Sequence, residues 1–238
     1  MEIKNKVALV TGAGRGIGRA IALSLAQDGA KLAIAARNQS ELENVAQEIR
    51  GLDSGAFVIP TDMREEPQVR DMIAKTVAHY GALHILVNNA GLGHFKTVAE
   101  MATAQWDEMF GVNLRGVFLA TREALPHLRK AGESFVINVA SLAGKNAFVN
   151  GGGYTATKWG LRAFSQCLML EERQFGVRVL VVCPGSVDTE FAAGRSGSLH
   201  SKKKEIIMPE DVAETIIMSL QMPQRTMVSE IDIRPTNP

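Results

Sequence analysis

Short apolar segments alternate with longer amphipathic segments along the whole chain. The candidate strands are Val7–Thr11, Lys31–Ala36, Ala56–Pro60, His84–Val87, Phe135–Val139, Val177–Cys183 and Met227–Ile233. Helical patterns cover residues 16–28, 39–50, 66–80, 103–130, 153–174 and 209–221. Strands that alternate with helices of this length form βαβ units and a parallel sheet, and continuously apolar strands indicate helices on both faces. With no linker or repeat to divide it, the chain is predicted to be one doubly wound α/β domain over residues 1–238.

Two segments depart from this pattern. Pro126 lies inside the 103–130 helical pattern, and its missing N–H predicts a kink or a break there. The segment Phe191–Lys204 has two glycines, three serines and three consecutive lysines, with almost no apolar periodicity. We expect residues 190–208 to form a mobile loop or lid over a substrate site, and the lysines to be a solvated face rather than a binding patch.

Charge and apolar content exclude several classes of protein. The chain has 26 basic and 25 acidic side chains, so it lacks the basic excess that binding to a phosphate backbone usually needs. No apolar run approaches the ~18 residues of a membrane span, and the N-terminus does not resemble a signal peptide. Cys167 and Cys183 lie in apolar runs, where a free cysteine behaves as a small hydrophobe. We therefore expect a cytoplasmic protein with reduced thiols, without a nucleic-acid or membrane partner.

A glycine-rich turn, Thr11–Gly18, joins the first strand to the first helix. Its pattern is TGxxxGxG, and its position suits a turn that cradles the phosphates of a dinucleotide at a helix N-terminus. The second strand ends at Arg37, where an NAD site would offer an acidic residue to the ribose. Arg37 and Arg15 can instead face a 2′-phosphate, which favours NADP(H) as the cofactor.

A tyrosine and a lysine stand four residues apart in the segment Tyr154–Lys158. On a helix they share a face, so the lysine charge lowers the pKa of the phenol toward useful acid–base chemistry. Ser141 ends the fifth strand, and Asn88–Gly91 ends the fourth. Ligands of doubly wound sheets bind beyond this edge, so the sequence predicts an active site there.

The motifs follow one another as TGAGRGIG (11–18), Asp62, NNAG (88–91), Asn113, Ser141, YTATK (154–158) and Pro184-Gly185 with Thr189. In this order and spacing the chain resembles the short-chain dehydrogenase/reductase family over essentially its whole length. The resemblance implies a single Rossmann domain with a mostly parallel seven-stranded sheet in the order 3-2-1-4-5-6-7.

The resemblance also implies the roles of four catalytic residues. Tyr154 would be the acid in reduction and the base in oxidation, and Ser141 would hydrogen-bond the reacting oxygen. Lys158 would bind the nicotinamide ribose and lower the pKa of Tyr154. Asn113 would hold a water that links Lys158 to solvent. No metal ligand is expected.

The cofactor contacts come from the same resemblance. They are Gly12, Arg15, Gly16, Ile17, Gly18, Arg37, Asp62, Met63, Asn89, Ala90, Gly91, Tyr154, Lys158, Pro184, Gly185, Val187 and Thr189. Asp62 and Met63 would flank the adenine, Asn89 the adenosine ribose, and Thr189 the nicotinamide carboxamide. Asp62 also has a second interpretation, as the aspartate of a turn or a helix N-cap.

The substrate is expected to be a small molecule with a ketone or aldehyde group, or the corresponding alcohol. The residues expected to border its pocket are the apolar Phe95, Leu142, Phe148, Val149 and Phe191, with Lys145 as a candidate for a carboxylate. An alternative is a 3-oxoacyl-[acyl-carrier-protein] reductase, with Arg129, Lys130 and Arg173 as a docking patch. A further alternative is a non-catalytic NADP-sensing regulator, which the intact catalytic residues disfavour.

A homodimer or homotetramer is expected from the resemblance, with the 103–130 and 153–174 helices at its main interface. The large apolar candidates there, each equally suited to the core, are Trp106, Phe110, Phe118, Trp159, Phe164 and Leu168.

Overall fold

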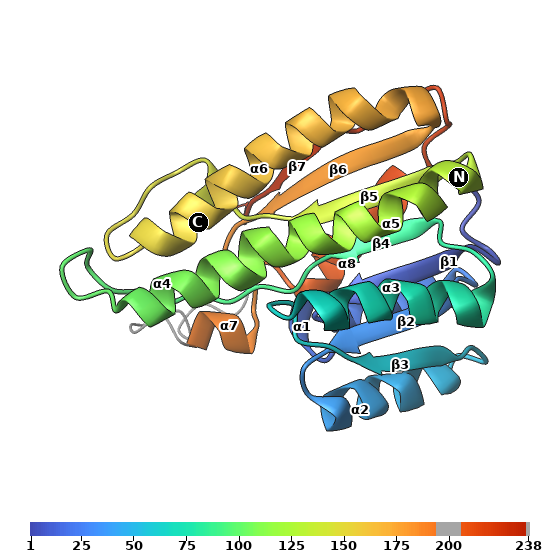
Figure 1. Cartoon of the computed structure of the whole chain (residues 1–238), viewed down its shortest axis with the longest axis horizontal. Helices are drawn as coiled ribbons and strands as arrows, with labels where there is room; N and C mark the ends of the chain where they lie inside the picture. The colour runs from blue at the N-terminus through green and yellow to red at the C-terminus, as the bar shows by residue number, and fades with distance from the viewer. Residues whose placement is uncertain (194–205, 237–238) are drawn as a thin grey trace.

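Seven parallel strands form one sheet in the computed structural model, which describes residues 1–193 and 206–236 (Figure 1). The strands are β1 (Val7–Thr11), β2 (Lys31–Ala36), β3 (Ala56–Pro60), β4 (Ile85–Asn88), β5 (Ser134–Val139), β6 (Val177–Pro184) and β7 (Glu230–Ile233). Their order is β3-β2-β1-β4-β5-β6-β7, and every neighbouring pair is parallel. The predicted doubly wound fold and strand order are confirmed.

Alternate side chains of each strand enter two separate cores, because successive residues of a strand point to opposite faces. Val10 and Ile34 pack with α1 (Gly16–Gln27), α2 (Gln39–Arg50) and α8 (Pro209–Gln221). Leu9 and Val136 pack with α3 (Glu66–Tyr80), α5 (Val117–Ala131) and α6 (Gly152–Glu172). Both faces of the sheet are therefore covered, which explains the continuously apolar strands.

The 103–130 pattern is broken, but not at the proline. Helix α4 (Thr103–Phe110) passes into a π-helical turn, η1 (Gly111–Gly116), before α5 begins. Pro126 lies on the exposed side of α5, which runs past it without interruption. Because Pro126 has no N–H, the carbonyl of residue 122 has no helical donor, but on this exposed side it can bind water. The packing of the buried side of α5 keeps the helix intact. The prediction of a kink or break at Pro126 was wrong, and the departure from α-helical geometry lies instead at Gly111–Gly116.

The two cysteines differ in environment. Cys183 is buried in β6, as expected for a small hydrophobe, whereas Cys167 is exposed. The buried positions of this part of α6 are Leu161, Ser165 and Leu168, so the helical period turns Cys167 to the opposite side. The expectation for Cys167 was wrong because an apolar run on a helix still has an outer face.

A short helix, α7 (Glu190–Ala193), begins the predicted lid. Residues 194–205, with the three lysines, lie outside the described residues. Among the helices of the described part, none is long and apolar enough to cross a membrane.

Candidate active site

A cleft of about 670 Å³ lies beyond the carboxyl ends of β1, β4, β5 and β6. Its lining includes every predicted catalytic and cofactor-binding residue except Gly18 and Asn113, which lie beneath its surface. The predicted residues come from segments far apart in the chain and meet because parallel strands end at the same edge of a sheet.

The glycine turn is shaped by close backbone contacts. Gly12 has a φ of +64°, and a Cβ on it would lie 2.7 Å from Cα of Ala90. Gly18 lies under the turn, where a Cβ would meet the carbonyl oxygen of Gly12 at 2.2 Å. Arg15 is the N-cap of α1 and makes no side-chain capping bond, so the first N–H groups of the helix remain for a ligand. Gly16 and Ile17 line the cleft there, as an anion site at a helix N-terminus requires.

Asn89 binds the glycine turn from β4. Its side-chain amide donates to the carbonyl oxygens of Thr11 and Gly12, each at 3.0 Å. The Thr11 hydroxyl in turn accepts from the backbone N–H groups of Asn89 and Ala90. These bonds give Asn89 a structural function in the turn, and its contact with the adenosine ribose stays a prediction.

Two arginines, Arg15 and Arg37, line the cleft near the glycine turn and the end of β2. The side chain of Arg15 is 64% exposed and pairs with Glu190, and that of Arg37 is 58% exposed with Nη1 3.7 Å from Oε1 of Glu108. Exposed ion pairs of this kind are weak, so each guanidinium remains available to a phosphate. Arg37 directly follows β2 and lines the cleft.

Asp62 lines the cleft and also holds a turn. It accepts from Arg64 through the backbone N–H at 3.0 Å and through Nη2 at 2.5 Å. The side-chain hydrogen bonds from Arg64 hold the pKa of Asp62 below its usual value. Its neighbour Met63 is buried at the cleft wall. Asp62 therefore stabilises a turn, as its second interpretation predicted. Its contact with the adenine stays a prediction.

Lys158 is a buried cation at the floor of the cleft. It is 4% exposed, and its Nζ donates to the carbonyl oxygen of Val139 at 2.9 Å. Burial lowers its pKa from 10.5 to about 8. Tyr154 is 8% exposed one turn earlier on α6, and its ring centre lies 5.8 Å from Nζ. The helix therefore places the phenol and the ammonium together on its cleft side.

Ser141 lies two residues after the end of β5 and lines the same cleft as Tyr154. Its Oγ accepts from the backbone N–H of Ala143 at 3.1 Å, and the same atom lies 3.5 Å from the carbonyl oxygen of Pro184. The short 3₁₀ helix η2 (Leu142–Gly144) begins directly after it. Ser141, Tyr154 and Lys158 all line the cleft, so two hydroxyls and one ammonium belong to the same site.

Asn113 lies in the π-helical turn and is fully buried. Its Nδ2 donates to the Leu92 carbonyl oxygen at 2.8 Å and to Oγ1 of Thr157 at 3.1 Å. Its Oδ1 accepts from the Leu92 backbone N–H at 2.9 Å. Asn113 thus joins the loop after β4 to α6, and its water-binding function stays a prediction. The π turn itself has no recognised sequence signal, although such turns are frequent at functional sites.

Aromatic rings surround Tyr154 on the substrate side. Phe95 meets it edge-on at 5.6 Å, and Phe191 lies 5.6 Å away in a tilted arrangement. Phe148 packs against Phe95 at 6.0 Å. Val149 is 86% exposed and does not join this group. Lys145 contacts Glu230 and Asp232, so it is already paired rather than directed at a substrate carboxylate.

Several further cleft residues were not predicted from the sequence. They include Asn38, Thr61, Val112, Asp188 and Glu210. Asn38 caps α2 by accepting from the backbone N–H groups of Ser40 and Glu41 at 3.0 and 3.4 Å. The Asn-x-Ser-Glu pattern directly after Arg37 was a signal for this cap. The others carry no local signal.

A family model described as short chain dehydrogenase matches residues 6–198, most of the chain. The chain belongs to the short-chain dehydrogenase family. It is therefore an oxidoreductase of the NAD(P)-dependent type, as predicted. An uncharacterized oxidoreductase of Staphylococcus aureus (strain MRSA252) is 33% identical over 233 residues, which cover 98% of both proteins.

Solved structures of the family superpose closely. The alcohol dehydrogenase of the archaeon Thermococcus sibiricus, complexed with 5-hydroxy-NADP, has a TM-score of 0.90 and 34% identity. The match covers 98% of this chain and 97% of that one. The 3-ketoacyl-(acyl-carrier-protein) reductase of Brucella melitensis, complexed with NADH, has a TM-score of 0.88 and 31% identity, with 97% of each chain covered.

Proposed function

We propose that this protein is an NADP(H)-dependent oxidoreductase that interconverts a ketone or aldehyde and its alcohol. The observation that carries the proposal is the meeting of Ser141, Tyr154 and Lys158 in one cleft with the glycine turn. Arg15 and Arg37 at the adenosine end favour a cofactor with a 2′-phosphate. The structural similarity to an alcohol dehydrogenase complexed with 5-hydroxy-NADP supports the same cofactor.

The cleft fits such a cofactor at both ends. The uncapped N-terminus of α1 offers backbone donors to the diphosphate. Lys158 gives one hydrogen bond to Val139, and an ammonium has three donors, so others can meet the ribose hydroxyls. When bound, the nicotinamide ring supplies or accepts the hydride, and the protein supplies position and electrostatics.

Tyr154 would transfer the proton. In reduction its hydroxyl gives a proton to the carbonyl oxygen, and in oxidation its phenolate takes one from the alcohol. The positive charge of Lys158 stabilises the phenolate, which lowers the pKa of the phenol. Ser141 donates a hydrogen bond to the same oxygen and stabilises the negative charge that develops there.

Asn113 would act through position. It holds the backbone of Leu92 by two hydrogen bonds at the cleft wall. We place beside Asn113 the water through which Lys158 exchanges protons with solvent. This exchange would return a proton to Tyr154 after each reduction.

A carbonyl panel with NADPH and NADH tests this function. We expect NADPH to be oxidised by medium-sized apolar ketones or aldehydes, which suit the ring cluster of Phe95, Phe148 and Phe191. NADH should support the reaction less well. No turnover of any carbonyl or alcohol, with NADP(H) still bound, would favour the regulator alternative instead.

A 3-oxoacyl-[acyl-carrier-protein] reductase is the second candidate, because one structural relative is named as such a reductase. The proposed docking patch is weaker than the sequence suggests. Arg129 is held by Glu172 at 2.7 and 2.5 Å and stacks on Phe175 at 4.4 Å. Rates of reduction of a 3-oxoacyl thioester, free and attached to its carrier protein, test this candidate. A much higher rate for the carrier-bound thioester would support docking of the carrier protein.

We also propose a homodimer or homotetramer in the cytoplasm. Trp106, Phe118 and Trp159 are 40–48% exposed, which is unusual for large rings and suits an interface. Leu168 is buried and belongs to the core. Light scattering of wild type and of Trp159→Glu tests the assembly, because the added charge should shift it toward monomer.

A further inference from the structure

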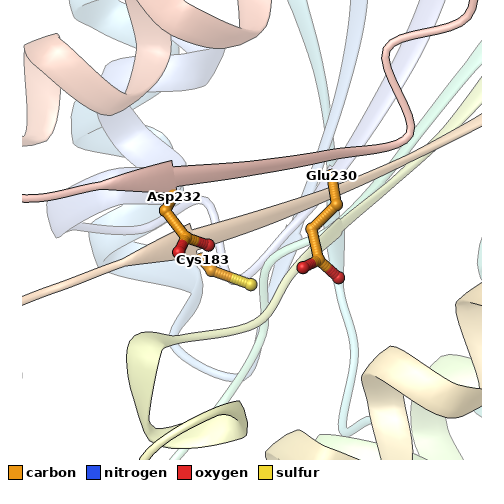
Figure 2. Close-up of side chains that lie close together, drawn as sticks. All are labelled: Cys183, Glu230 and Asp232. Carbon is orange, nitrogen blue, oxygen red and sulfur yellow. The ribbon is translucent and has the colours of Figure 1, made fainter.

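Two acidic residues of β7 and one cysteine of β6 form a cluster beside the catalytic serine. Glu230 and Asp232 are two residues apart on β7, and Cys183 is the partner of Asp232 on the neighbouring strand β6. Figure 2 shows the Cys183 side chain extending from beside Asp232 toward Glu230. Their ligand atoms lie within 4.8 Å of one another. Lys145 contacts both carboxylates. Arg162 of α6 binds Glu230 with two hydrogen bonds, each of 3.0 Å.

Both carboxylates of this cluster are already paired with cations of the chain. Lys145 and Arg162 face the two carboxylates, and Arg234 adds a contact to Asp232 at 3.3 Å. Burial raises the pKa of Cys183 to about 11, so its thiol keeps its proton. A cation would have to displace the ammonium of Lys145 and deprotonate the thiol. The arrangement is therefore an anchor of ion pairs rather than a metal site.

The anchor holds the turn that follows Ser141. Lys145 directly follows η2 as its C-cap, and Nη1 of Arg162 donates to the carbonyl oxygen of Gly144 at 2.7 Å. Both cations that bind Glu230 are thereby attached to this one turn. Ser141 belongs to the same turn, because its Oγ accepts from Ala143.

The turn also has little freedom on its other sides. A Cβ on Gly144 would lie 2.9 Å from the carbonyl oxygen of Lys158, so the turn packs directly on the catalytic helix. The side chains of Glu230 and Arg162 are 23% and 18% exposed. A bidentate pair that is this well covered fixes geometry better than a solvated surface pair does.

We propose that Glu230 is a positioning residue for Ser141, acting through Arg162 and Lys145. This inference rests on the function proposed above for Ser141. Its physical basis is that a hydroxyl that stabilises developing charge must keep its place, and a shift of about 1 Å can lower a rate by about 100-fold. The last strand of the sheet thus helps to fix the position of the serine that follows the fifth strand.

Amide hydrogen exchange in the cofactor-free protein tests the anchor without any turnover. In Glu230→Gln we expect the amides of Ala143, Gly144 and Lys145 to exchange at least about tenfold faster, with α1 and α2 unchanged. Lys145→Met should do the same, and Lys145→Arg should restore protection. Glu66→Gln is the matched control, because Glu66 also binds two arginines, Arg115 and Arg122, at 2.9 and 2.8 Å. Unchanged exchange of the turn in Glu230→Gln and Lys145→Met would overturn the inference.

A double-mutant cycle tests the link to Ser141. We expect Glu230→Gln to lower kcat about tenfold while the Kd of NADPH stays within about twofold. In a Ser141→Ala background the same substitution should have almost no further effect, because the hydroxyl it positions is gone. Losses that multiply in the double variant would overturn the inference. A wild-type protein without activity would contradict the proposed function instead, and the exchange experiment would still decide on the anchor.

Discussion

The ammonium nitrogen of Lys158 lies 5.8 Å from the centre of the Tyr154 ring, one turn away on α6. The lysine is buried, and its pKa of about 8 is the result of that burial. The fold therefore keeps an ionisable amine where solvation is poor, next to the phenol that we propose as the proton donor.

Lys158 should reduce the stability of the cofactor-free protein. A folded-state pKa of about 8 against 10.5 disfavours the charged form in the folded state, and this penalty is complete below pH 8. We expect Lys158→Met to be inactive and to raise the free energy of unfolding by about 1–3 kcal/mol near neutral pH, net of the hydrogen bond lost by Val139. The difference should shrink as pH rises from 8 toward 10.5. Denaturant unfolding from neutral pH to pH 10.5 measures this difference, and the exposed Lys130→Met is the control. A Lys158→Met protein that is less stable than wild type at neutral pH would contradict the prediction.

Arg37→Asp should change the cofactor preference. Loss of a charged hydrogen bond to the 2′-phosphate should raise the Kd of NADPH about 10–100-fold, with NADH changed by less than about threefold. Titration calorimetry with both cofactors measures this. Arg50→Asp, on the exposed last turn of α2, is the charge-matched control and should change neither. Equal losses for the two cofactors would remove the 2′-phosphate argument.

Gly18→Ala should damage the phosphate turn. The new Cβ would lie 2.2 Å from the carbonyl oxygen of Gly12, which is fixed backbone. We expect a loss of about 1–3 kcal/mol in the free energy of unfolding and weaker NADPH binding. Gly55→Ala is the control, because nothing lies within 4 Å of its Cβ position. Equal stability of the two variants, with unchanged NADPH binding, would contradict the close approach of Gly18 to the Gly12 carbonyl.

His84 should make the fold sensitive to acid. Its Nδ1 accepts from the backbone N–H of Val7 at 3.1 Å, which needs the neutral ring. Burial, with a smaller contribution from Lys6, lowers its pKa below 6.5. Its contribution to stability is therefore full above pH 6.5 and is lost as pH falls through the folded-state pKa. His84→Asn keeps an acceptor without this titration, so its melting temperature should fall less on acidification. A parallel decline in both proteins would contradict the assignment.

Local sequence patterns were sufficient for the elements and for most of the cleft. Val7–Thr11 and the glycines after it have a local signature, and the strand order then brings distant motifs to one edge. The π turn around Asn113 has no such signature, so its position was missed and Pro126 was given the break instead. The contact of Lys145 with Asp232 joins positions 87 residues apart, and only the folded sheet reveals it. Pairings of this kind depend on tertiary packing rather than on local propensity.

The central claim is that Tyr154 transfers the proton. The direct measurement is single-turnover oxidation of bound NADPH by an active carbonyl substrate, in wild type and in Tyr154→Phe, with the Kd of NADPH measured for each. We predict a rate at least about 10³-fold lower in the variant, since general acid catalysis is worth about 10²–10⁴-fold, with NADPH affinity nearly unchanged. A variant that oxidises NADPH at the wild-type rate would contradict the account.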